Sequence, residues 1–216
     1  MPRAAPNVAE LRPRDADRTQ ESLLRAAMEE LSQRGLGGAR VDRIAERAGI
    51  NKKLIYYYFG NKEKLFLAVL ETTYADIRTA EKALNLETLA PVAAVRGLVA
   101  FTWQYFLDHP EFLNLLNSEN LHGARHLRQS KQIREMHSPL VALLGEVLER
   151  GRKSGIFRGG VDPIQLYISI AALAYFYLSN NPTLSTIFGR NLRAKKALAE
   201  RLSHITEVVM GYLLRD

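Results

Sequence analysis

The sequence has 216 residues, 47% of them apolar, 25% charged and none of them cysteine, and its formal net charge is +7. This length and composition indicate a folded chain of one or two domains, and the missing cysteines exclude disulfides and thiolate metal sites, so a cytoplasmic location is expected. No signal peptide or membrane-spanning apolar run is visible, and the basic charge favours a polyanionic partner such as nucleic acid.

The first segment, residues 1–16, is predicted to be a disordered basic arm. Proline, alanine and arginine are frequent there, and the arginines of its first 14 residues are opposed only by Glu10. From about Asp17 to Arg34, apolar residues recur at helical spacing, and Gly35 is positioned to end that first helix as a C-terminal cap.

A compact helix-turn-helix is predicted over residues 41–59. Apolar residues mark a short second helix that stops at Gly49, and Asn51 can cap a third helix that ends at Gly60. Asn61 is the next candidate cap, and the apolar stripe of a long fourth helix continues to Ile77.

The remainder is predicted to be helical, because proline is favoured at the first helical position and several prolines punctuate it. The expected segments run roughly 91–107, 110–120, 124–136, 139–153, 163–179 and 191–214. Ser138 and Asp162 precede two of these prolines and are expected to act as caps. Only a few residues near Gly155–Arg158 read as extended. The predicted fold class is all-α, a three-helix helix-turn-helix head with a C-terminal helical bundle, about nine to ten helices in total.

Positive charge gathers around the helix-turn-helix, where six cations are opposed only by Asp42 and Glu46. The cations are Arg40, Arg43, Arg47, Lys52, Lys53 and Lys62. On the third helix, lysines and tyrosines lie opposite Ile55 and Phe59, so cations can contact phosphates while rings press against sugars or thymine methyl groups. The alternative is that the lysines form a solvated face and the tyrosines pack.

The stretch IAERAGINKKLIYYYFGNKEKLFLAVL, residues 44–70, resembles the DNA-binding head of the tetracycline-repressor (TetR) family, and the match runs from about Arg18 to Leu70. It rests on the Ile-Ala pair, the Ala-Gly-Ile turn, the aromatic cluster ending at Phe59 and the Asn-Lys-Glu opening of the fourth helix. The resemblance implies DNA contacts on the third helix and a phosphate contact at the start of the fourth. The predicted DNA-binding residues are Arg40, Asn51, Lys52, Lys53, Tyr56, Tyr57, Tyr58 and Lys62. Ala39, Lys53 and Leu54 depart from the family pattern, so no operator sequence is inferred.

The resemblance also implies a function, that of a transcription regulator, a repressor released from operator DNA by a small-molecule effector. The expected domains are the arm (1–16), a DNA-binding helix-turn-helix (17–62) and a C-terminal ligand-sensing and dimerisation domain (63–216). The expected partners are double-stranded operator DNA, an effector and a second copy of the chain, with no membrane and no cofactor. The sequence leaves open the effector, the operator, the regulated genes and the sign of control.

The last two long helices carry more apolar residues than a lone helix pair can hide. In TetR-like proteins the matching helices form a four-helix dimer interface. The predicted interface is therefore Leu166, Ile170, Leu173, Phe176, Tyr177, Leu202, Ile205 and Val209. The alternative is that these side chains complete the core of one chain.

A ligand pocket is predicted in the C-terminal domain, because that part of the chain mixes aromatic side chains with a few polar ones. The predicted lining is Trp103, Phe106, Phe112, Asn117, His122, His126, Tyr167 and Tyr175. This mix favours a compact, partly aromatic or polar metabolite. The alternative is core aromatics with surface histidines. Glu119, His122 and His126 have a spacing that suits a metal, but Gly123 interrupts the segment, so surface histidines are favoured over a metal site.

Two other classes of function remain as alternatives. An enzyme would need a nucleophile with its base, a phosphate-binding glycine loop or a dense ligand cluster, and none has meaningful spacing here, so the chain is not predicted to be an enzyme. A DNA-binding protein without an effector, or one controlled by a partner, would instead have a C-terminal domain filled by its own side chains.

Overall fold

The computed structural model describes residues 13–215, which fold into α-helices, and this confirms the predicted all-α class. The chain divides into two compact units. Unit 1 comprises residues up to 74 together with 114–133, and unit 2 comprises 75–113 together with the residues from 134 onward. Within the described residues, no helix combines the length and the apolar character that a membrane span requires.

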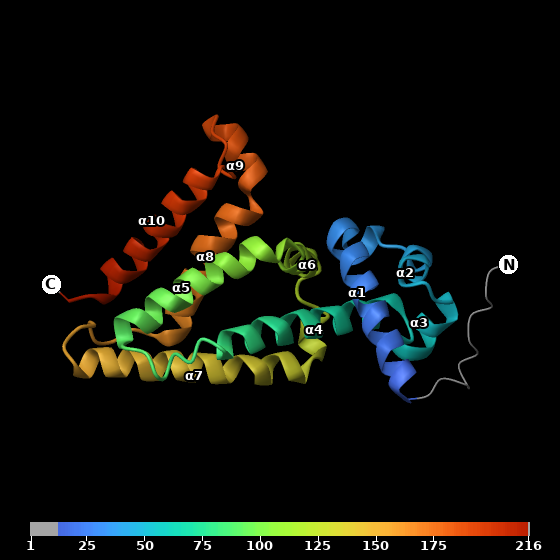
Figure 1. The fold of residues 1–216 in the computed structure, drawn as a ribbon, viewed down its shortest axis with the longest axis horizontal. Helices are drawn as coiled ribbons and strands as arrows, with labels where there is room; N and C mark the ends of the chain where they lie inside the picture. The colour runs from blue at the N-terminus through green and yellow to red at the C-terminus, as the bar shows by residue number, and fades with distance from the viewer. Residues whose placement is uncertain (1–12, 216) are drawn as a thin grey trace. The chain divides into compact units, whose positions relative to one another are not determined.

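Unit 1 begins with α1 (Pro13–Gly38), followed by α2 (Val41–Ala48), α3 (Lys52–Phe59) and the first turns of α4 (Lys62–Lys82) (Figure 1). Residues 1–12 of the predicted arm lie outside the described residues, and Pro13–Ala16 already belong to α1. Gly35 has φ 64° and ψ 172°, so it interrupts the helix where the sequence predicted an end.

The predicted caps at Asn51 and Asn61 are confirmed. The side-chain oxygen of Asn51 accepts a hydrogen bond from the backbone N–H of Lys53 at 2.9 Å, and that of Asn61 accepts one from Lys64 at 2.8 Å. Gly49 has φ 67° in the left-handed region and ends α2. These local features satisfy backbone groups that a helix end leaves open, and they define the end of α2 and the starts of α3 and α4.

The core of unit 1 joins its helices through fully buried aliphatic side chains, among them Leu31, Ile44, Ile55 and Leu65. Burying each such side chain contributes about 1.5–3 kcal/mol to folding. The segment 114–133 belongs to the same unit. The Ser118 hydroxyl accepts a hydrogen bond from the backbone of Leu36 at 3.2 Å, and the Ser130 hydroxyl donates one to Glu71 at 2.6 Å.

In unit 2, α5 (Pro91–Asp108), α8 (Pro163–Ser179) and α10 (Lys195–Leu213) pack against one another. α6 (Pro110–Leu121) follows α5, and α9 (Asn181–Phe188) joins α8 to α10 at the far end of that helix pair (Figure 1). Val95, Leu98, Trp103, Ile170 and Leu213 are almost completely buried there. The predicted cap at Asp162 is confirmed, because its side chain accepts hydrogen bonds from the backbone of the first turn of α8.

The region after α6 differs from the prediction of two helices at 124–136 and 139–153. A single helix, α7 (Lys131–Lys153), contains Pro139 in its interior, and a 3-10 turn, η2 (Leu127–Gln129), precedes it. The expected helix start at Pro139, and with it the cap at Ser138, is therefore wrong. Proline removes one backbone donor from a helix, and the residues on both sides of it keep the helix continuous here.

The C-terminal boundaries differ as well. α9 lies between the expected segments 163–179 and 191–214, where no helix was predicted, and α10 begins at Lys195 rather than near residue 191. The extended residues predicted near 155–158 form one bridge, in which Phe157 pairs with Leu214 and the backbone N–H of Arg158 donates to Leu213 at 2.8 Å. A Cβ at Gly151 would lie 2.0 Å from the Phe157 ring, so only glycine admits this ring at the end of α7.

Candidate DNA-contacting surface and ligand cavity

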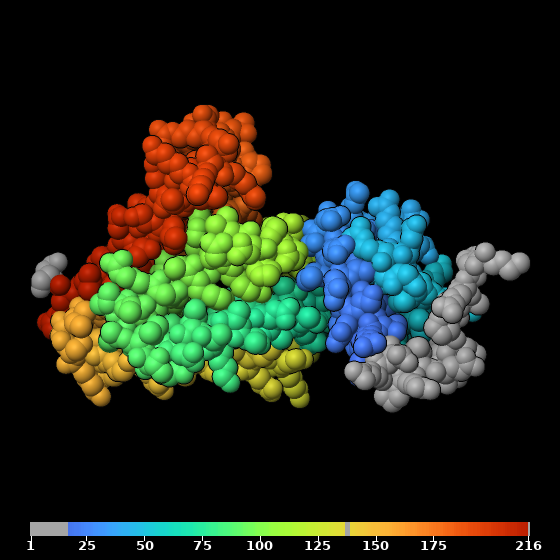
Figure 2. All heavy atoms as spheres, in the orientation of Figure 1, coloured from blue at the N-terminus to red at the C-terminus, as the bar shows by residue number. Residues whose placement is uncertain are grey.

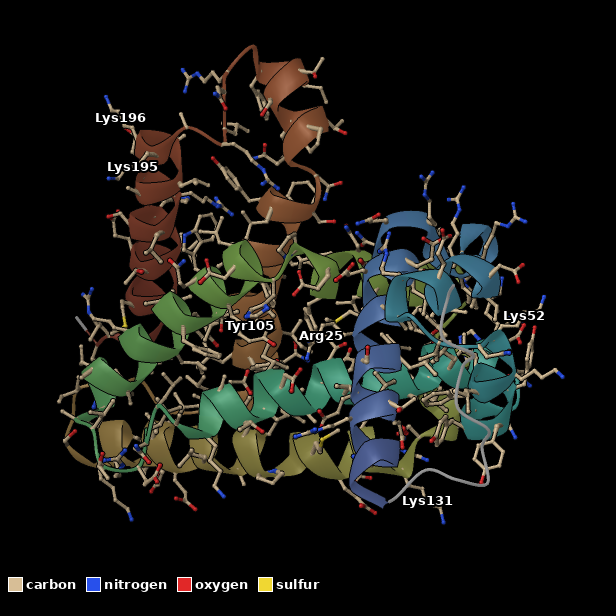
Figure 3. The ribbon with its side chains drawn as sticks, turned by 45° about the vertical axis from the view of Figure 1, so that its right-hand side comes forward. Arg25, Lys52, Tyr105, Lys131, Lys195 and Lys196 are labelled. Carbon is tan, nitrogen blue, oxygen red and sulfur yellow. The ribbon has the colours of Figure 1, made fainter. Side chains whose placement is uncertain are left out.

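Helix α3 separates an apolar face from a face that carries its lysines and tyrosines. Ile55 is fully buried, whereas Tyr56 and Tyr57 are 49% and 66% exposed. Lys52 and Lys53 are exposed on the same helix, and Figure 3 shows Lys52 pointing away from it. Leu54 and Phe59 join Ile55 in the core, so burial fixes which side of α3 is free to contact another molecule.

Tyr58 differs from the other two tyrosines of α3. It is half-buried, and its ring lies 5.2 Å from that of Tyr57 in an edge-to-face arrangement. Edge-to-face packing limits the rotation of both rings. Tyr58 therefore supports the exposed ring of Tyr57 at the surface of α3.

Lys62 and Arg40 flank this surface. The Lys62 ammonium donates a hydrogen bond to the carbonyl oxygen of Ala39 at 3.2 Å, which ties the start of α4 to the turn before α2. An ammonium has three donors, so this bond leaves others for a phosphate. The side chain of Arg40 is exposed, and its backbone N–H donates to the carboxylate of Glu30 at 3.3 Å.

Carboxylates hold several cations of the surface in place. Lys52 and Asp42 form an exposed ion pair at 2.9 Å, and this hydrogen bond lowers the pKa of Asp42 below its usual value. Arg47 pairs with Glu29 at 3.1 Å. Exposed pairs of this kind contribute little stability, so a phosphate can replace the carboxylate as the partner of the cation.

The predicted ligand residues of unit 1 take part in its internal structure. His126 is 3% exposed, and its Nδ1 lies 2.6 Å from the fully buried carboxylate of Glu119, which also accepts the backbone N–H groups of His126 and Leu127. The interpretation of His126 as a surface histidine is therefore wrong. His122 is half-buried, with its Nδ1 2.7 Å from the carbonyl oxygen of Ser118.

The spacing that could suit a metal does not lie on one helix, because α6 ends at Leu121, before the two histidines. Among the residues that the structure describes, no group of three potential ligands has metal-binding geometry. Asn117 also belongs to unit 1 and takes part in an interaction with another group.

The predicted ligand residues of unit 2 mostly fill its core. Trp103 is 2% exposed and its ring lies 5.7 Å from that of Tyr177, while Phe106 and Phe112 stack at 5.7 Å. Tyr167 accepts a hydrogen bond from Arg78. Tyr175 lies on α8 and is half-buried.

A cavity of about 560 Å³ lies elsewhere in unit 2, between the end of α4 and the middle of α7. None of the predicted ligand residues lines it. Its lining is Ala75, Arg78, Thr79, Glu81, Lys82, Glu87, Met136, Pro139, Leu140, Leu143 and Glu146. This cavity was not expected from the sequence, in which α7 was predicted as two separate helices. The signal that was available is the pair Arg78 and Glu81, one turn apart beside the apolar position Ile77.

Arg78 and Glu81 form a buried ion pair at this cavity, with Nη1 and Oε2 2.7 Å apart and side chains 8% and 3% exposed. Burial raises the pKa of Glu81 to about 7, and the Arg78 charge opposes that rise. Tyr105, labelled on α5 in Figure 3, is 8% exposed, and burial together with nearby carboxylates raises its pKa to about 12.

The predicted interface residues of α8 and α10 divide into two groups. Leu166, Ile170, Tyr177, Ile205 and Val209 are buried within the chain, and Leu173 and Leu202 are half-buried. Only Phe176 of the predicted set is exposed, at 58%. The exposed apolar side chains of these helices are instead Ile164, Ile168, Phe176, Val208 and Tyr212, which we call the apolar stripe.

Two family models match this chain. The model of bacterial regulatory proteins of the tetR family matches residues 23–69, and a tetracyclin repressor-like C-terminal domain matches residues 91–209. The chain is 41% identical over 205 residues to the HTH-type transcriptional repressor NicS of Pseudomonas putida. The matched region covers 95% of this chain and 97% of NicS. It is 29% identical over 207 residues to the HTH-type transcriptional regulator RutR of Escherichia coli, covering 92% of each.

Solved structures share the fold. A TetR family transcription regulator from Marinobacter aquaeolei matches with a TM-score of 0.69 at 19% identity, over 95% of this chain and 100% of that one. FadR from Bacillus subtilis, in complex with stearoyl-CoA, matches with a TM-score of 0.65 at 17% identity, over 89% and 98%. Sequence and fold thus lead to the same group of proteins.

Proposed function

This chain belongs to the TetR family of bacterial transcription regulators, and we propose that it represses transcription through α3 and leaves its operator when a small molecule occupies the cavity of unit 2. The observation that carries the proposal is the division of α3, where Ile55 is fully buried while Tyr56 and Tyr57 are exposed beside Lys52 and Lys53. A helix that binds in the major groove presents exposed cations and rings to the DNA while its opposite, apolar face packs against the protein core.

Each part of the surface has a distinct role in this proposal. Lys52, Lys53 and Lys62 contact phosphates and set the register on the duplex. The rings of Tyr56 and Tyr57 contact base edges or thymine methyl groups and contribute sequence preference. Phosphate contacts act on any DNA, whereas ring contacts in the groove depend on the base sequence, so the two can be separated by mutation.

The functional form in this proposal is a homodimer. The recognition helix has only 8 residues, and a two-fold dimer doubles its contacts on a near-palindromic operator. The apolar stripe on α8 and α10 supplies the contact surface, because it leaves large apolar side chains such as Ile168 and Phe176 more than half exposed. The tip formed by α9 stands out from the surface in Figure 2 and adds Ile187 and Phe188, which are 68% and 64% exposed.

The effector occupies the cavity between α4 and α7. Its volume of about 560 Å³ is within the range of small-molecule sites, and a domain filled by its own side chains would have none. FadR, which shares the fold, holds stearoyl-CoA in its solved structure. For a ligand to control operator binding it must favour one conformation, and a preference of about 1–3 kcal/mol gives a 5- to 150-fold change in operator affinity.

The test is selection of DNA by the purified chain from fragmented genomic DNA, followed by anisotropy titration of the enriched sequence against a scrambled one. The expected result is one near-palindromic sequence, bound at least tenfold more tightly than its scrambled version. Equal affinity for both would contradict repression through a specific operator. A small-molecule screen on the enriched complex then tests release.

A further inference from the structure

The cavity of unit 2 combines an apolar wall with a charged, buried end. Met136, Leu140 and Leu143 of α7 line one side, and α4 contributes Arg78 and Glu81. Both of these charged side chains are more than nine-tenths buried. A guanidinium keeps its charge even when buried, so it needs acceptors inside the protein.

Arg78 is incompletely partnered. Its Nη2 donates to the hydroxyl of Tyr167 at 2.8 Å, and its guanidinium lies 5.5 Å from the centre of the same ring. Its Nη1 is close to Glu81, but the two groups are not oriented for a hydrogen bond, and Nε has no hydrogen-bond acceptor. Oε2 of Glu81 likewise accepts no hydrogen bond. Unpaired buried donors are costly, and an acceptor that enters the cavity offsets that cost.

The charge of Arg78 is also incompletely balanced. Burial raises the pKa of Glu81 to about 7, so this carboxyl is only partly ionised at neutral pH. The other titratable groups that interact with Glu81 are Tyr105 of α5 and Tyr167 of α8, and burial raises the pKa of both. Neutral tyrosines supply no negative charge, which leaves a buried cation with a weak counter-ion.

Resting on the proposed function, we infer that this cavity binds a small carboxylic acid, with its carboxylate on Arg78 and its apolar body against Met136, Leu140 and Leu143. A carboxylate supplies both the missing acceptors and the missing charge. When Glu81 is protonated, its O–H can donate to the same carboxylate.

The rest of the lining limits the charge of the ligand. Glu87 and Glu146 are exposed residues of the same cavity. When Glu81 is ionised, the three carboxylates outnumber the two cations, Arg78 and Lys82, and this excess negative charge disfavours a doubly charged anion such as a phosphate monoester more than a singly charged one. A monocarboxylate therefore fits the cavity better than a phosphate.

Arg201 provides a matched control within the same unit. It donates one hydrogen bond, to the carbonyl oxygen of Leu173, its guanidinium lies 5.4 Å from the ring of Tyr177, and its Nε has no hydrogen-bond acceptor. It shares these features with Arg78 but does not line the cavity. Replacing either arginine removes a guanidinium from above a tyrosine, and only Arg78→Gln changes the proposed site.

The test is calorimetric titration of the full chain with two acids and their neutral amides, benzoate against benzamide and hexanoate against hexanamide. We expect at least one acid to bind more than tenfold more tightly than its amide, equivalent to more than about 1.4 kcal/mol. Arg78→Gln should abolish this preference and Arg201→Gln should retain it. Equal binding of acid and amide, retention of the preference in Arg78→Gln, or failure of both acids to bind at millimolar concentration would each overturn the inference.

Two further measurements keep the outcome unambiguous. If Arg78→Gln does not fold, as judged by circular dichroism, Arg78→Lys retains the charge and should retain the preference for the acid. Loss of that preference in Arg78→Lys would count against charge recognition.

Anisotropy with operator DNA separates this inference from the proposed function. Acid binding that depends on Arg78 but leaves operator affinity unchanged supports the site and refutes effector control. Release of DNA by an acid that binds Arg78→Gln as tightly as wild type refutes the site.

Discussion

The ammonium of Lys62 at the start of α4 donates a hydrogen bond to the carbonyl oxygen of Ala39 in the turn before α2. In the proposed complex the same ammonium contacts a phosphate. Lys62→Ala should weaken binding to specific and random DNA about equally and reduce the salt slope by about one. The measurement is anisotropy across a salt series. Lys195→Ala removes the same charge from an exposed site on α10 and should leave the slope unchanged. A slope that is unaltered in Lys62→Ala would show that Lys62 contacts no phosphate.

Tyr57 is the most exposed of the α3 tyrosines, at 66%. Tyr57→Ala should reduce affinity for the selected operator by about 1–3 kcal/mol and change affinity for random DNA little, because a ring contact in the groove depends on the base sequence. Leu121→Ala removes a large exposed apolar side chain from α6, outside both the proposed DNA-contacting surface and the proposed dimer surface, and serves as the control. Equal losses on both DNAs would assign Tyr57 to the DNA backbone rather than to the bases.

The apolar stripe predicts the effect of charge on assembly. Glutamate at both Ile168 and Phe176 should give folded monomers, because the dimer would bury unpaired charges. Val209→Glu is a poor test, since Val209 is 3% exposed within the chain and the change should unfold it. Sedimentation velocity distinguishes these results, with Ser203→Glu on α10 as an exposed polar control. A monomeric wild-type protein at micromolar concentration would contradict the dimer.

Gly151 accommodates the ring of Phe157 at the end of α7. Gly151→Ala should destabilise the fold by about 1–3 kcal/mol, because the new methyl group overlaps a fully buried ring. Gly97→Ala, inside α5 with no heavy atom within 4 Å of its added Cβ, should instead stabilise by about 0.5–1 kcal/mol. Urea unfolding measures both. A stable Gly151→Ala protein would show that the Phe157 ring readily moves aside.

The raised pKa of Glu81 predicts a pH dependence of stability. The folded chain favours the protonated carboxyl of Glu81. The stabilisation of the folded state by this group is therefore fully present below pH about 4.5 and is lost as the pH rises through about 7. The loss amounts to at most about 3 kcal/mol. Urea unfolding between pH about 5 and 8 should show the decline in wild type and in the control Glu149→Gln, whose side chain is partly exposed, and a flatter profile in Glu81→Gln. Identical profiles for Glu81→Gln and wild type would assign the decline to other groups.

The helices of the DNA-binding head were predictable because short-range chemistry determines their ends. Asn51 and Asn61 cap the helices that follow them through bonds to residues two or three positions away. Gly49 supplies the left-handed conformation that ends α2. Such bonds need no distant partner, so the sequence alone contains them.

The cavity was not predictable in the same way. Arg78 and Glu81 are three residues apart on a helix, a spacing that usually belongs to a solvated pair. The hydrogen bond that Arg78 donates to Tyr167 of α8, together with the neighbouring α7 residues, places them in the interior. The prediction of a helix start at Pro139 was wrong because proline is usually found at the first position of a helix, whereas Pro139 lies inside α7.

The two units are interleaved along the chain, since residues 114–133 belong to unit 1 although the preceding 39 residues, 75–113, belong to unit 2. This interleaving limits how segments can be exchanged between related regulators. A chimera that joins the first 74 residues of one regulator to the remainder of another separates Leu36 from Ser118 and Glu71 from Ser130, partners that bond within unit 1. A functional graft therefore has to carry two segments, and recombination at a single crossover breaks a cooperative unit.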